Sequence, residues 1–77
     1  MYKNVLEYKL IQTIGQYGIV RTREQYYLDD GSRFGRVHVV YDVCLDNGDG
    51  DIVASFYMLK LARKYARGEL KGVFKWN

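Results

Sequence analysis

The sequence predicts an α+β fold, in which a small antiparallel sheet of three to five strands has one helix from the C-terminal half packed on one face. Three observations lead to this prediction. Residues 6–14 and residues 37–45 alternate apolar and polar side chains with the two-residue period of half-buried strands. Clusters of Gly, Asn and Asp divide residues 6–45 into runs, as turns do. Residues 56–67 instead repeat apolar and basic side chains with a helical period.

Chain length and composition limit what the protein can build. With 77 residues we expect one domain, residues 1–77, around a single hydrophobic core. The chain is 48% apolar and 16% aromatic, which is far from the composition of disordered proteins. Aromatic side chains bury a large area while losing few rotamers, so they help a core this small to form.

Residues 6–14 and residues 19–28 are predicted to form a hairpin. In the first run, alternate positions are apolar, which places them on one half-buried face. These side chains are Leu6, Tyr8, Leu10 and Ile14. Residues 15–18 contain two glycines and fit the turn, while the second run mixes β-branched and aromatic side chains with charged ones. Asp30 and Gly31 suit the tight turn that follows.

Residues 37–45 show the clearest strand pattern, and we expect this strand to be central in the sheet. The apolar side chains that share one face are Val37, Val39, Tyr41, Val43 and Leu45. Residues 46–50, with two Asp, one Asn and two Gly, are typical of a turn. Residues 51–54 then form either a short fourth strand or a lead-in to the helix.

A helix is predicted over residues 56–67, where good helix formers dominate. Ser55 fits the N-cap position, and Gly68 fits the C′ position just after the last turn. After Gly68 the chain reaches residues 73–76, which form either an edge strand or a packed tail.

Positive charge is concentrated near the C-terminus. Residues 1–54 carry six basic and eight acidic side chains, whereas residues 55–77 carry six basic and one acidic. The basic residues recur at helical spacing and form a basic row that is a candidate partner-binding face. Its members are Lys60, Arg63, Lys64, Arg67 and Lys71. The alternative is a solvated outer face whose cations complement the helix dipole.

Aromatic side chains exceed what so small a core can readily hide. Tyr and Trp dominate binding hot spots because they bury large areas at low entropy cost, so exposed ones are candidate partner contacts. The candidates are Tyr17, Tyr26, Tyr27, Tyr57 and Trp76. The alternative is that these rings tile the two faces of the sheet.

Catalytic and metal-binding motifs are not found in the sequence. His38 and Cys44 lie six residues apart on one predicted strand, about 20 Å, which is too far for a nucleophile and its base or for a shared metal. The acidic turn lacks the ligand spacing of a calcium loop, and no phosphate or dinucleotide motif occurs. We therefore expect no enzymatic activity, no metal and no cofactor.

Cysteine usage and apolar run length indicate the compartment. A single cysteine excludes an internal disulfide, and the N-terminus lacks a secretory signal pattern. No apolar run approaches the roughly 20 residues that span a bilayer. We therefore expect a cytoplasmic protein, in a bacterial or host cytosol, with no membrane partner.

Small size, abundant aromatic residues and the lack of catalytic motifs favour a non-enzymatic protein-binding module. We expect an inhibitor or regulator, of the kind that phages and mobile elements encode, that occupies a partner protein's surface. The alternative is a nucleic-acid-binding protein whose basic helix face tracks phosphates while sheet tyrosines stack on bases. A homodimer would also accommodate the surplus aromatic rings.

Overall fold

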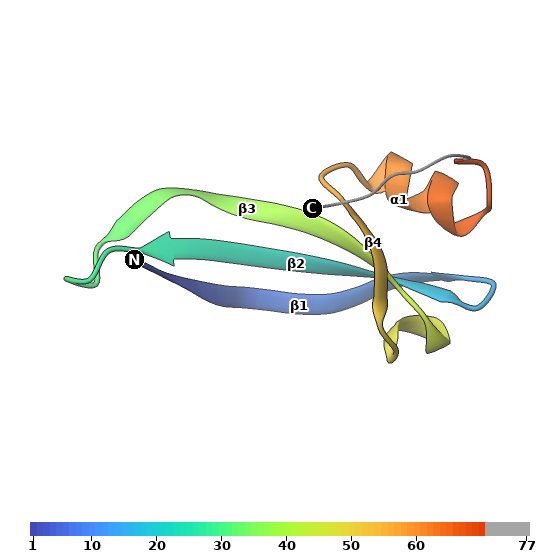
Figure 1. Cartoon of the computed structure of the whole chain (residues 1–77), viewed down its shortest axis with the longest axis horizontal. Helices are drawn as coiled ribbons and strands as arrows, with labels where there is room; N and C mark the ends of the chain where they lie inside the picture. Colours follow the sequence, from blue (N-terminus) through green and yellow to red (C-terminus); the bar gives the residue numbers. More distant parts are fainter. Residues whose placement is uncertain (71–77) are drawn as a thin grey trace.

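A four-stranded antiparallel sheet in the order β1-β2-β3-β4 and one helix form the fold, which confirms the predicted α+β class (Figure 1). The computed structural model describes residues 1–70. Its elements are β1 (Tyr2–Ile14), β2 (Tyr17–Tyr27), β3 (Arg33–Cys44), the 3-10 turn η1 (Asp46–Gly48), β4 (Ile52–Phe56) and α1 (Leu59–Ala66). β3 pairs with both β2 and β4, as expected of a central strand.

The strands differ greatly in length, and this makes the molecule elongated. β1, β2 and β3 have 13, 11 and 12 residues, whereas β4 has five. The molecule measures 43 × 23 × 18 Å along its principal axes. In Figure 1, β4 and α1 lie at one end, while the N-terminus and the β2–β3 turn lie at the other. We call residues 2–8, 22–27 and 33–40 the distal ribbon.

The hydrophobic core lies at the α1 end of the sheet. Across β2, β3 and β4, Ile19, Val43 and Ala54 stand opposite one another and share a face. The buried core is completed from β4 and α1 by Phe56, Ala62 and Ala66. We call this side of the sheet the helix face and the other side the open face.

Helix α1 begins three residues later than predicted, so the assignment of Ser55 as its N-cap is wrong. β4 continues to Phe56, which pairs with Tyr41, and Ser55 hydrogen-bonds within the sheet instead. The N-cap is Met58, without a side-chain cap. At the other end Gly68 has a φ of 75°, as its predicted C′ position requires. Of the two alternatives for residues 51–54, the strand is correct; residues 73–76 lie outside the described residues.

The predicted half-buried face of β1 is only partly correct. Register shifts between Val5 and Glu7 and between Leu10 and Gln12 each insert a residue, and an inserted residue reverses the alternation of faces. Ile14 packs against the core as predicted, together with the bulged Ile11. Tyr8 and Leu10 instead lie on the open face and are 60% and 48% exposed.

Two phenylalanines test where stability resides. Phe56 is 1% exposed, whereas Phe34 in the distal ribbon is 52% exposed. We expect Phe56→Ala to destabilise the fold by about 3–5 kcal/mol, because it removes core contacts and leaves a cavity. Phe34→Ala, the matched control, should change stability by about 0.5 kcal/mol or less. Urea denaturation followed by circular dichroism measures both, and equal losses would contradict this location of the core.

Candidate binding surface

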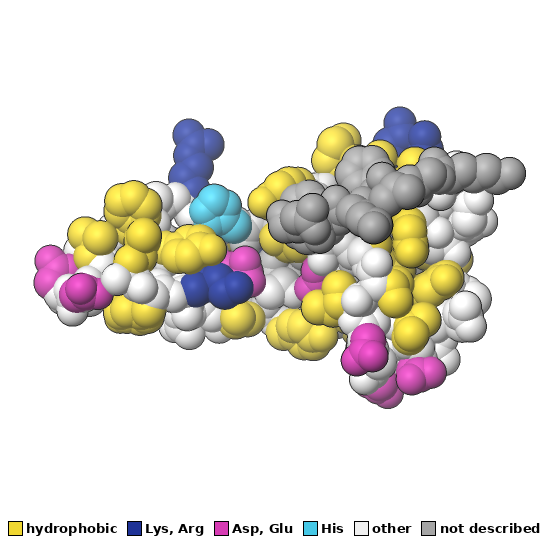
Figure 2. Space-filling model, viewed as in Figure 1, with side chains coloured by type: hydrophobic (Ala, Val, Ile, Leu, Met, Phe, Trp, Pro, Cys, Tyr) yellow, Lys and Arg dark blue, Asp and Glu magenta, His cyan; other side chains and the backbone are white. Residues whose placement is uncertain are grey.

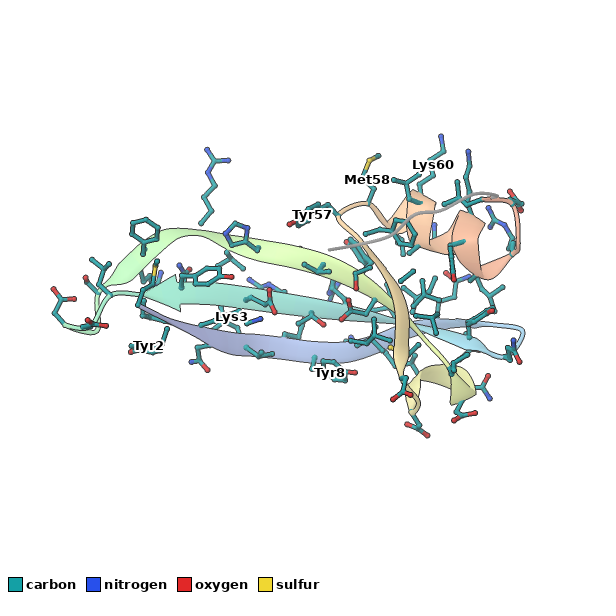
Figure 3. All side chains as sticks on the ribbon, in the orientation of Figure 1. Tyr2, Lys3, Tyr8, Tyr57, Met58 and Lys60 are labelled. Atoms are coloured by element: carbon teal, nitrogen blue, oxygen red, sulfur yellow. The ribbon has the colours of Figure 1, made fainter. Side chains whose placement is uncertain are left out.

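Exposed apolar side chains are concentrated on β1, an edge strand of the sheet. They are Tyr2, Val5, Leu6, Tyr8 and Leu10. Figure 3 shows Tyr2 and Tyr8 projecting at the outer side of β1, and Figure 2 shows apolar side chains along the ribbon. Exposed apolar edge strands favour pairing with another strand, so β1 is a candidate interaction surface. Most of this exposed surface could not be predicted from the sequence, because the two bulges change which face of the sheet the β1 side chains occupy.

The open face of the distal ribbon ends in an aromatic corner formed by Tyr26, Phe34 and His38. Phe34 stands opposite Tyr26 in the register, and the Tyr26 and His38 rings meet edge-on with centroids 5.8 Å apart. Phe34 and His38 are exposed. Charge on this face is largely neutralised, since Lys3 pairs with Glu24 at 3.1 Å.

The helix face is basic along β1 and β2 and in the adjoining part of β3. Alternate positions of β2 place Arg21 and Arg23 there, with Lys9 opposite Arg21 on β1. Arg33 stands opposite Tyr27, whose ring stacks on Tyr2 with centroids 5.4 Å apart. Glu7 pairs with Arg21 at 3.0 Å. From the sequence the positive field was predicted on the helix alone, because alternation within one strand does not show which residues of neighbouring strands lie on the same face.

The predicted basic row on α1 is partly tied into local contacts. Lys60 is exposed (Figure 3), but Arg63 donates a hydrogen bond to Gln12 at 2.8 Å and Lys64 is half-buried. Arg67 pairs with Glu69 at 2.6 Å. Lys71, the last predicted member, lies outside the described residues.

Three of the predicted aromatic contacts are half-buried rather than exposed. Tyr17 packs edge-on against Tyr65 of α1, while Tyr26 and Tyr27 contact the neighbouring rings described above. A half-buried ring can tile the sheet and still offer its exposed part to a partner, so both interpretations of these three rings stay predictions. Tyr57 is 61% exposed, as expected, and Trp76 lies outside the described residues.

A buried carboxylate joins three strands on the open face. Asp42 of β3 accepts hydrogen bonds from Thr22 of β2 at 3.1 Å and from Ser55 of β4 at 2.5 Å. Both hydroxyl groups are buried, and within the described residues every buried side-chain polar atom has a partner. A buried carboxylate is costly unless it is hydrogen-bonded, so this cluster maintains the pairing of β2, β3 and β4.

Cys44 lies beside this cluster and is fully buried. Burial, and then the charge of Asp42, raise the pKa of the Cys44 thiol above its ordinary value of 9.0. Tyr8 lies close enough for burial, Cys44 and Asp42 to raise the pKa of its hydroxyl as well. Both groups therefore stay protonated at neutral pH, and the thiol is a poor nucleophile.

No family model, curated protein or solved structure matches this chain. Within the described residues, no group of three or more His, Cys, Asp or Glu side chains is arranged to hold a metal ion. In residues 1–70, no helix has the length and apolar character needed to cross a membrane. We therefore infer function from the exposed surface of the sheet.

The raised thiol pKa predicts a loss of stability at high pH. In the unfolded chain the thiol ionises near its ordinary pKa of 9.0, whereas in the folded state it holds its proton to higher pH. The contribution of the buried thiol to folding stability is complete below the unfolded-state pKa of 9.0 and declines as pH rises above it. Between about pH 8 and pH 10, urea midpoints should therefore fall more steeply for the wild type than for Cys44→Ala. Urea midpoints that fall equally with pH in the wild type and in Cys44→Ala would contradict this prediction.

Proposed function

We propose that this chain is a small non-enzymatic module that binds another protein, as an inhibitor or regulator that occupies its partner's surface. The observation that carries this proposal is the distal ribbon with its exposed aromatic corner. Within the described residues, α1 is the helix that packs on a face of the sheet, and it lies at the other end of the molecule (Figure 1).

Energetics support a protein partner for the corner. Phe34 exposes about half of its surface although it is a large apolar side chain. Covering apolar area contributes about 25 cal/mol per Å², and aromatic anchors supply much of the energy of protein interfaces. Tyr26 and His38 already constrain each other, so little further entropy is lost when a partner covers them.

Charge substitution at the corner tests this function. Phe34→Glu places a charge where the partner would bury a ring, while Ile52→Glu is a matched control because Ile52 is 54% exposed on β4, at the α1 end. We expect the wild type and Ile52→Glu to retain one protein from nuclease-treated host lysate, and Phe34→Glu to lose it at least about tenfold. Equal retention by both variants would contradict the proposed surface.

A second candidate function is binding of single-stranded nucleic acid on the helix face. The observation that favours it is the set of basic side chains there, next to the stacked Tyr2 and Tyr27 rings. Cations attract phosphates, and exposed ring faces stack on bases. Lys60 of α1 adds an exposed cation near one end of the sheet.

Salt dependence tests this second function. Each phosphate contact to a single strand contributes about 0.7 to the slope of log affinity against log salt. Replacing Arg23 and Arg33 with Gln should therefore lower the slope by about 1.4, measured by fluorescence anisotropy with a labelled single-stranded oligonucleotide. Lys3→Gln, on the open face, is the control and should leave the slope nearly unchanged. An unchanged slope in the double variant would exclude this face.

A further inference from the structure

The outer edge of β1 is a long strand edge without a neighbour in the described sheet. β1 is the first strand in the order, so β2 is its only partner there. It is 13 residues long, contains no proline and carries most of the exposed apolar side chains of the distal ribbon. Proteins usually shorten or block such an edge, because its free backbone groups pair with other strands.

We propose that a second copy of this chain occupies this edge, with the two β1 strands antiparallel about a twofold axis at Tyr8. Tyr8 is the midpoint of Tyr2–Ile14, so this register overlaps the strands over their whole length. It places Glu7 of each copy opposite Lys9 of the other.

Charge complementarity is the first argument for this occupant and this register. Glu7 and Lys9 lie on the same face of β1, opposite Arg23 and Arg21 of β2. Within its own chain Lys9 therefore faces a like charge, which is unfavourable. Glu7 of the same chain already pairs with Arg21 at 3.0 Å and leaves Lys9 without a carboxylate opposite it. In the dimer, Glu7 of each copy stands opposite Lys9 of the other, so two oppositely charged pairs form across the edge. Moving the twofold axis by one residue to Glu7 or to Lys9 would instead place like charges opposite each other.

The bulges provide the second argument. Residues that pair directly across antiparallel strands must lie on the same face. About Tyr8, Lys3 meets Thr13 on the open face, and Asn4 meets Gln12 on the helix face. The two inserted residues, Leu6 and Ile11, meet Leu10 and Val5, so apolar side chains face one another. An axis at Glu7 fails this test, because Val5 of the open face would meet Lys9 of the helix face.

This interface is separate from the surface of the proposed function. Phe34 belongs to β3, and β2 lies between β3 and β1. The dimer therefore leaves the aromatic corner free in both copies. We expect Phe34→Glu to remain dimeric, so a failure of the dimer and a failure of partner binding are distinguishable.

Charge exchange tests the dimer. Sedimentation equilibrium from micromolar to millimolar protein should show a monomer–dimer equilibrium for the wild type. Glu7→Lys and Lys9→Glu each place like charges opposite one another twice, so each should raise the dimer dissociation constant about tenfold or more. Mixing the two variants places opposite charges together again and should restore the dimer.

The mixing experiment also controls for folding, since only folded chains can restore the dimer. A wild type that stays monomeric from micromolar to millimolar concentration would overturn the proposal. A strand from another protein would then be the remaining partner for the β1 edge. Dimers of undiminished affinity in both single variants would overturn it as well.

A cysteine trap tests the register. Paired residues of antiparallel strands have Cα atoms about 4.5–5.5 Å apart, which a disulfide can bridge. In a Cys44→Ala background, Tyr8→Cys should form a disulfide-linked dimer under mild oxidation. Thr13→Cys, also exposed on the open face of β1, is the control and should remain monomeric, because it faces Lys3 of the other copy. Equal cross-linking at both positions would exclude an axis at Tyr8.

Discussion

The packing of α1 on one end of the sheet is the interaction on which the rest of the structure depends. Ile19, Val43 and Phe56 are almost fully buried there, and the two alanines of α1 allow the helix to approach closely. Beyond this contact the long strands are held by their backbone hydrogen bonds and cross-strand pairs. The distal ribbon is therefore a projection anchored at one end, and its side chains are available to other molecules.

The polar cluster on the open face complements this core. Asp42 receives hydrogen bonds from hydroxyl groups on both neighbouring strands, so it maintains the pairing of β4 with the longer strands. Because these hydroxyl groups are buried and donate to the carboxylate, the cluster supports the fold. The exposed features lie on the ribbon, where apolar and aromatic groups mark the open face and arginines mark the helix face.

Bulges in β1 decide how this surface is divided. An inserted residue at Leu6 and another at Ile11 let one strand contribute to the core near its end and expose Tyr8 and Leu10 on the opposite face. A regular strand with the same sequence would keep its alternate apolar residues on a single face. The proposed homodimer uses the same irregularity, because both bulged residues meet apolar partners when the twofold axis lies at Tyr8.

The sequence by itself determined the fold class, the central position of β3 and the turn at Gly68, because alternation, turn residues and C-cap chemistry are local properties. Only the tertiary structure decided the start of α1, since pairing of Phe56 with Tyr41 extends β4 past the predicted N-cap. It likewise decided which β1 side chains are exposed. Burial depends on the register between strands, and one inserted residue, which local pattern does not reveal, reverses the faces.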